Sequence, residues 1–270
     1  MGLFDRKTPL QKEWEILEKK EKKFLEARLT KQDSLINRTL EEKVPEKLQS
    51  TLDSAFAKAF QLIFDKGTGV IEKTYSKEKL QQEFEIRDYA SEAKKDRKSL
   101  KAISKGAKGT GNRNLLLSGV SGIGMGVLGI GLPDIPLFTG MIFKNIYEIS
   151  LNYGIPYDTE EEKQFILQVI KGAVSYGDEL KNIDQALDEY MYTGAFSTEI
   201  SVEDQIRETA GALSKELLYL KFLQGIPVVG AVGGMYDAIY MKRISAYASL
   251  KYQKRYLSMQ RKKYIEVSKS

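Results

Sequence analysis

The hydrophobic and polar positions of this chain repeat with the period of an α-helix over most of its length. Apolar residues recur every three or four positions after Thr159 and again after Ser201. An acidic residue follows each of these hydroxyl residues three positions later, Glu162 and Asp204, which is a signature of a helix N-terminus. No set of segments alternates with the period of two that strands require. The pattern predicts an all-α fold.

Other segments extend this prediction. Pro45 suits the first turn of a helix that runs to Gly67, and residues 77–104 have the pattern of a second long helix. Three glycines in residues 106–114 predict a loose linker. A short helix is expected around residues 183–190.

The two ends of the chain are richer in charge than its middle. Residues 7–43 are mostly charged and carry only a thin apolar stripe, so we expect a helical arm that lies on the domain or on a partner, or that is solvated. The predicted organisation is a charged N-terminal helical arm (1–43), a single multi-helix domain (44–258) and a basic C-terminal tail (259–270).

The longest apolar run extends from Leu115 to Phe143 and contains seven glycines but a single charged residue, Asp134. Its first 18 residues approach the roughly 20 that a membrane-spanning helix needs, and basic residues precede it. Pro133 and Pro136 then break the run. These features favour a hairpin that touches a membrane or is buried in the domain, over a true transmembrane span.

A second segment resembles this run. Gly131-Leu-Pro-Asp-Ile and Gly225-Ile-Pro-Val-Val match at an offset of 94 residues, and each is followed by a Gly-Met step. We therefore expect two apolar helical hairpins, each broken by Gly and Pro. The residues predicted to contact a membrane or a ligand lie at these breaks: Leu132, Pro133, Asp134, Ile135, Pro136, Ile226, Pro227, Tyr236, Asp237 and Tyr240.

Asp134 has two interpretations. It can cap the helix that follows it, or it can act with Asp237 on a polar head group or a cation, because an unpaired buried carboxylate is costly.

The C-terminal helix is basic and aromatic. From Ala238 to Ser270 a single acidic residue, Glu266, accompanies nine basic residues and five tyrosines. Cationic aromatic helices suit an anionic lipid surface, whereas nucleic acid is a less favoured partner, and a solvated face is the alternative without function. The predicted anionic-surface residues are Lys242, Arg243, Lys251, Lys254, Arg255, Arg261, Lys262 and Lys263.

Composition excludes several classes of site. The chain has no cysteine and no histidine, so disulfides, Ser-His-Asp triads and imidazole zinc sites are impossible. No catalytic residue, metal site or cofactor is predicted. Residues 1–30 have no apolar signal region, and we expect a cytoplasmic protein, peripheral at the inner face of the cell membrane.

Four motifs together resemble the EcsC family of bacterial proteins, over roughly residues 40–255. They are Val44-Pro-Glu-Lys-Leu, Gly131-Leu-Pro-Asp-Ile-Pro-Leu with Ile146-Tyr-Glu-Ile, Tyr157-Asp-Thr-Glu-Glu-Glu-Lys, and Ile226-Pro-Val-Val-Gly-Ala-Val-Gly-Gly. The resemblance implies an all-α, membrane-associated protein linked to an ABC transporter, and it implies no established activity for particular residues.

The sequence therefore predicts a non-enzymatic accessory protein that engages an anionic membrane or a membrane transporter through its apolar hairpins and basic C-terminal helix. One alternative is a soluble module that binds a lipid or acyl chain between helices. Another is a hydrolase that acts on a lipid or peptide without His or Cys. Ligand identity and oligomeric state do not follow from the sequence.

Overall fold

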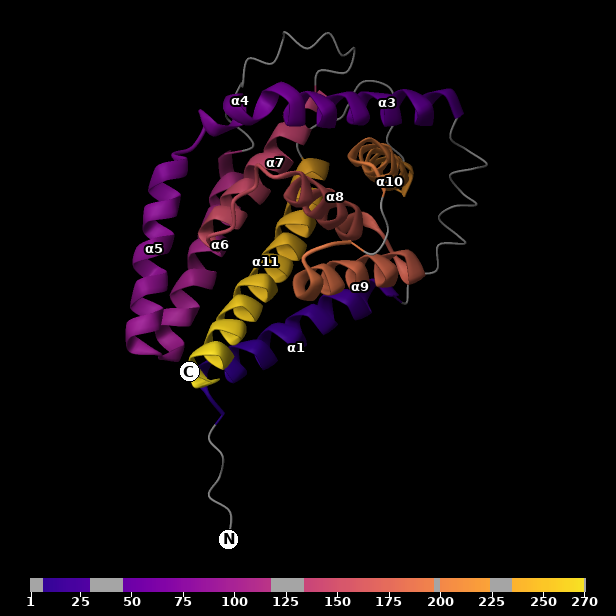
Figure 1. The fold of residues 1–270 in the computed structure, drawn as a ribbon. Coiled ribbons are helices and arrows are strands. Elements are labelled where there is room, and N and C mark those ends of the chain that lie inside the picture. Colours follow the sequence, from indigo (N-terminus) through magenta and orange to yellow (C-terminus); the bar gives the residue numbers. More distant parts are fainter. Residues whose placement is uncertain (1–6, 30–45, 118–133, 197–199, 224–234, 270) are drawn as a thin grey trace.

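The computed structural model of the chain describes residues 7–29, 46–117, 134–196, 200–223 and 235–269. Every regular element within these ranges is helical (Figure 1), so the predicted all-α class is confirmed. The elements are α1 (Pro9–Leu29), α3 (Glu46–Leu62), the π-helical turn η1 (Ile63–Gly67), α4 (Thr68–Glu72), α5 (Lys77–Lys94), α6 (Arg97–Leu117), α7 (Asp134–Asn152), α8 (Glu160–Val174), α9 (Gly177–Thr193), α10 (Val202–Leu223) and α11 (Met235–Lys269).

The predicted helix starts at Thr159 and Ser201 are confirmed. The Thr159 hydroxyl accepts a hydrogen bond from the backbone N–H of Glu162 at 3.2 Å, at the start of α8. The Ser201 hydroxyl accepts from the N–H of Asp204 at 3.1 Å, at the start of α10. These side chains satisfy backbone donors that a helix N-terminus leaves unpaired.

The predicted helix over 77–104 and the linker over 106–114 were both wrong. The first is divided at Lys95, which has the left-handed backbone conformation that ends a helix, and Asp96 then caps α6 by accepting from the N–H of Ser99 at 2.7 Å. α6 continues through the glycines to Leu117. Gly106 has a packing role there, because a Cβ at this position would lie 2.1 Å from Nη1 of Arg87.

α11 runs through the middle of the molecule, and the other helices are arranged around it (Figure 1). α1, α6, α7 and α8 pack against it, α5 packs against α6 and α7, and α3 lies across one end of the molecule. α10 packs mainly against α3 and α8. α11 therefore touches helices from both halves of the sequence.

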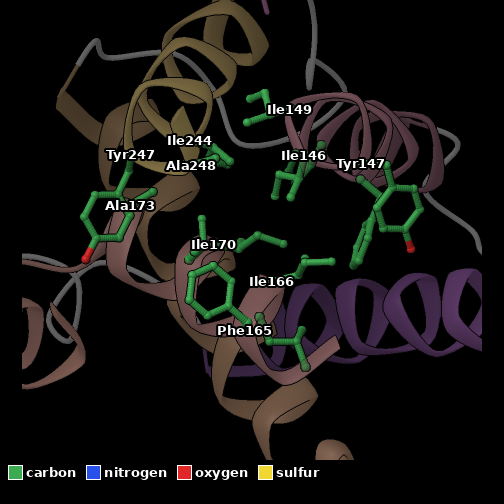
Figure 2. Close-up of a cluster of buried hydrophobic side chains, with 14 of the residues drawn as sticks. Ile146, Tyr147, Ile149, Phe165, Ile166, Ile170, Ala173, Ile244, Tyr247 and Ala248 are labelled. Carbon is green, nitrogen blue, oxygen red and sulfur yellow. The ribbon is translucent and has the colours of Figure 1, made fainter. Parts of the chain in front are cut away.

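A cluster of buried hydrophobic side chains lies where α7, α8 and α11 meet (Figure 2). Ile146, Ile170 and Ile244 each contribute a fully buried side chain to it. Burial of apolar surface on this scale is the main stabilising term in a helical domain. The same core holds the last part of the long apolar run, since Ile142 and Phe143 are also fully buried.

The predicted arm is a helix that packs on the domain. α1 lies against α11, α6 and α9, with Leu17 buried and the ring of Phe24 stacked on Tyr247 at a centroid distance of 5.0 Å. Of the three possibilities expected for the arm, the structure has the one in which it lies on its own domain.

The Gly/Pro breaks of the two apolar hairpins fall mostly outside the described residues, in 118–133 and 224–234. Among the helices that are described, none is both long and apolar enough to cross a membrane.

Two glycines in helix interiors test the packing of this core. A Cβ at Gly172 of α8 would lie 2.8 Å from the Tyr247 ring and 3.0 Å from Ile183, whereas nothing lies within 4 Å of a Cβ at Gly211 of α10. Tyr247 cannot move aside easily, because it is stacked on Phe24. We expect Gly172→Ala to lower the free energy of unfolding by about 1–2 kcal/mol, through overpacking.

The matched control, Gly211→Ala, should raise the free energy of unfolding by about 0.5–1 kcal/mol, because alanine is the better helix former. Urea unfolding of both variants measures the difference. Equal effects of the two substitutions would show that α8 does not approach α9 and α11 this closely.

Candidate functional site

The structure places three of the ten predicted contact residues in the core. Ile135 and Tyr240 are 1% and 0% exposed, Pro136 is also buried, and the Tyr240 hydroxyl donates to the backbone carbonyl of Glu216 at 2.6 Å. These three side chains pack inward because α7 and α11 turn these faces toward the core, so they are not available to an outside surface in this conformation. Leu132, Pro133, Ile226 and Pro227 lie outside the described residues, as do the side chains of Asp134, Tyr236 and Asp237.

The eight predicted anionic-surface residues divide into two groups. Lys242, Arg261, Lys262 and Lys263 are exposed. Arg243, Lys251, Lys254 and Arg255 form ion pairs with carboxylates of α1, α8, α9 and α10. The prediction that this second group forms an open cationic face was therefore wrong. A buried cation needs a paired acid, and the fold supplies one for each of the four residues.

The largest ionic cluster joins α1, α9 and α11. Nζ of Lys251 lies 2.7 Å from Glu21, 2.6 Å from Asp184 and 2.9 Å from Asp188. Nζ of Lys254 lies 2.6 Å from both Glu21 and Asp188. Three helices that are distant in sequence are thus held by five charged side chains.

Lys251 is the most completely buried cation of this cluster, with an exposed fraction of 0%. Burial by itself would lower the pKa of its ammonium, but Asp184, Glu21 and Asp188 more than offset this and raise the pKa above its ordinary value. Since the folded pKa is the higher one, the resulting stabilisation is fully present below the unfolded pKa of 10.5 and is lost only as pH rises through the folded value.

The three carboxylates of this cluster are also the group of described residues best placed to hold a metal ion, since their ligand oxygens lie within 4.8 Å of one another. Both lysine ammonium groups, however, lie within 3 Å of these oxygens. The lysines thus provide the positive charge that a cation would bring, and the arrangement is an ion-pair cluster.

A second ionic group joins α8 to α11. Nη1 of Arg255 donates to both carboxylate oxygens of Glu162, at 2.9 and 2.7 Å, and the hydroxyl of Tyr252 donates to the same carboxylate at 2.5 Å. Burial raises the pKa of Glu162, and Arg255 and Tyr252 oppose that shift. The guanidinium of Arg255 also lies 4.3 Å from the ring centroid of Phe165, a cation–π geometry.

A third ionic group joins α10 to α11. Nη1 of Arg243 donates to Glu216 at 2.7 Å and to the hydroxyl of Tyr176 at 2.8 Å, and that hydroxyl in turn donates to Glu216. Desolvation, followed by the charge of Glu216, raises the pKa of Tyr176, so the tyrosine stays a hydrogen-bond donor. No group in these three ionic clusters is poised as a nucleophile or base, and their chemistry is that of structural ion pairs.

Asn145 of α7 differs from these groups. It is fully buried, and neither atom of its side-chain amide has a hydrogen-bond partner within the part of the chain that the structure describes. A buried polar group without a partner costs about 1–3 kcal/mol, so this residue is a candidate for a functional role.

Sequence reasoning missed the acids that pair with α11. Asp184 and Asp188 are one helical turn apart, and Glu162 was interpreted only as part of a cap. A usable signal was the lack of a continuous polar face on α11, where apolar and tyrosine side chains surround the basic ones.

Lys251 provides a test of the ion-pair account. We expect Lys251→Met to lower the free energy of unfolding by about 3–5 kcal/mol, because the substitution leaves three carboxylates clustered without their central cation. Thermal unfolding near neutral pH measures the loss. Lys262→Met, at an exposed position of the same helix, is the control and should change stability by less than about 0.5 kcal/mol. A loss below about 1 kcal/mol for Lys251→Met would contradict the account.

Replacement of Asn145 is expected to stabilise the protein, in contrast to replacement of Lys251. We expect Asn145→Leu to raise the free energy of unfolding by about 1–3 kcal/mol, because an apolar side chain of similar size removes the unpaired amide. Urea unfolding measures the gain, and Asn152→Leu is the control. Asn152 is equally buried but accepts from Nη2 of Arg87 at 2.9 Å, so its replacement should destabilise. A destabilised Asn145→Leu would show that the amide is paired in solution.

Comparison with known proteins identifies one family. The model of the EcsC protein family matches residues 11–257. No curated protein and no solved structure matches the chain.

Proposed function

The chain belongs to the EcsC protein family, and we propose that it is a non-enzymatic accessory protein that engages an anionic membrane surface. The proposed contact is the end of the molecule where α6 ends and where α7 and α11 begin. The observation that carries this proposal is that both apolar segments of the sequence join the described helices at this one end.

The convergence of these helix ends supports the proposal. Figure 1 shows the end of α6 and the first turns of α7 and α11 on the side of the molecule where α3 lies, away from the C-terminus of α11. The rings of Phe56 in α3 and Phe138 in α7 are 6.5 Å apart. An apolar segment that enters a membrane beside a second one buries more apolar surface than either segment alone.

Basic residues of α6 add an electrostatic term. Lys108 and Arg113 belong to the second half of α6, nine and four positions before its last residue, Leu117. α6 contains no acidic residue between Arg97 and Leu117. At a rise of 1.5 Å per residue, Lys108 and Arg113 lie roughly 14 and 6 Å from the end of α6 where the apolar segment begins, and a basic side chain near an anionic surface contributes about 1 kcal/mol.

The basic residues at the C-terminal end of α11 take no part in the proposed contact. Arg261, Lys262 and Lys263 lie at the far end of α11, and the 1.5 Å rise per residue puts Arg261 roughly 39 Å from Met235. One flat membrane surface at the α3 end is therefore out of their reach. The basic residues of the proposed contact are therefore those of α6 and not those of the C-terminal tail.

Vesicle flotation tests the proposal. We expect the full chain to float with phosphatidylglycerol-containing vesicles at low salt, and Leu128→Glu to reduce the bound fraction at least tenfold, because a charge in the membrane interior costs about 2–3 kcal/mol. Tyr264→Glu is the control. It makes the same charge change at an exposed position of the distal end of α11 and should leave flotation unchanged.

Two results would contradict the proposal: a wild-type chain that stays unbound at low salt, or equal losses in the two variants. Binding to vesicles only when they contain a membrane protein would also contradict it, since the partner would then be that protein and not the lipid.

A further inference from the structure

α1 is attached to the domain in an unusual way for a helix of this length. Its fully buried side chains are Glu13, Leu17 and Glu21, which recur every fourth residue and so form one stripe. Two of these three are acids. By contrast, eight of the nine buried residues of α8 are uncharged, and seven of those are apolar side chains.

Each buried acid of α1 contacts a cation of another helix. Glu13 accepts from Nε of Arg97, the first residue of α6, at 2.5 Å. Glu21 accepts from Lys251 and Lys254 of α11, at 2.7 and 2.6 Å. The attachment of α1 therefore depends on charge pairs at both ends of its buried stripe.

Most of the apolar side chains in the attachment of α1 are only partly buried. Leu17 is the one fully buried apolar side chain of α1. Leu10, Trp14, Phe24 and Leu25 are partly buried against the core, with Phe24 stacked on Tyr247 and the guanidinium of Arg261 lying 4.8 Å from the Trp14 ring centroid. A fully buried leucine contributes about 1.5–3 kcal/mol. The four partly buried side chains each contribute less than they would if fully buried, so the charge pairs supply a large share of the attachment of this 21-residue helix.

We propose that α1 is a detachable latch, which opens and closes while the helices from α3 to α11 keep their fold. Opening uncovers a strip of α6 and α11 that carries Arg97, Lys251, Lys254 and Arg261. This inference does not depend on the proposed membrane contact, which lies at the N-terminal end of α11 and not over its middle.

The ionic cluster makes such an opening energetically feasible. When Glu21 leaves, Lys251 remains paired with Asp184 and Asp188, and Lys254 remains paired with Asp188. Neither buried ammonium is left without a carboxylate, which is the situation that carries the largest penalty. Residues 30–45 separate α1 from α3 in the sequence, and a chain of that length can reach roughly 50 Å when extended.

A single tryptophan makes the latch observable. Trp14 is the one tryptophan of the chain and belongs to α1. We expect Glu21→Gln to shift the Trp14 emission to longer wavelength and to increase its quenching by acrylamide, because the indole moves into water. Glu26→Gln is the matched control, since Glu26 is an exposed acid of the same helix that pairs locally with Lys22, and it should change neither signal.

Hydrogen exchange of the wild-type chain supplies a measurement that needs no substitution. The latch predicts that α1 amides exchange at least tenfold faster than those of α8, and that adding NaCl accelerates α1 alone, because salt stabilises separated charges. Exchange of α1 at the rate of α8 would overturn the proposal, as would a Glu21→Gln variant whose Trp14 signals match the wild type. Loss of the whole fold in Glu21→Gln, with slow α1 exchange in the wild type, would also overturn it.

Discussion

The need of each buried cation for a carboxylate governs the arrangement of this fold. α11 brings Arg243, Lys251, Lys254 and Arg255 into the interior, and each is paired with an acid from another helix. Desolvating such a charge costs several kcal/mol unless a partner is placed within hydrogen-bonding distance. The ion pairs therefore set where α1, α8, α9 and α10 can lie relative to α11. The apolar core, part of which lies where α7, α8 and α11 meet (Figure 2), supplies the main stabilising term.

Local signals in the sequence were enough to predict the helices but not the pairs between them. The caps at Thr159 and Ser201 act within one turn and were predictable. The α6 glycines misled the prediction, because a helix penalty of about 1 kcal/mol each does not prevent α6 from continuing to Leu117. Gly106 lies close to Arg87, whereas a Cβ at Gly109 would meet nothing within 4 Å. The contact of Lys251 with Glu21 joins residues that are distant in sequence. The apolar and tyrosine neighbours of Lys251 in α11 indicate its burial, but nothing in the local pattern identifies the acids that pair with it.

The N-terminal and C-terminal ends of α11 have different surroundings, and the two proposals concern different parts of this helix. Its first turns lie at the end of the molecule where both apolar segments join the fold, and its last turns are basic and exposed. The middle of the helix is covered by α1 through charge pairs. A membrane contact at one end and a releasable helix over the middle can therefore act separately, because they use different residues.

A double-mutant cycle on Glu162 and Arg255 tests the central claim most directly. Each single change, Glu162→Gln or Arg255→Met, removes one partner of a buried bidentate pair. If the pairs govern the fold, each single variant loses about 3–5 kcal/mol of unfolding free energy, and the double variant is at least as stable as either single one. Losses that simply add in the double variant would show that the two side chains act independently, and would contradict the claim that α11 is held in place by its buried ion pairs.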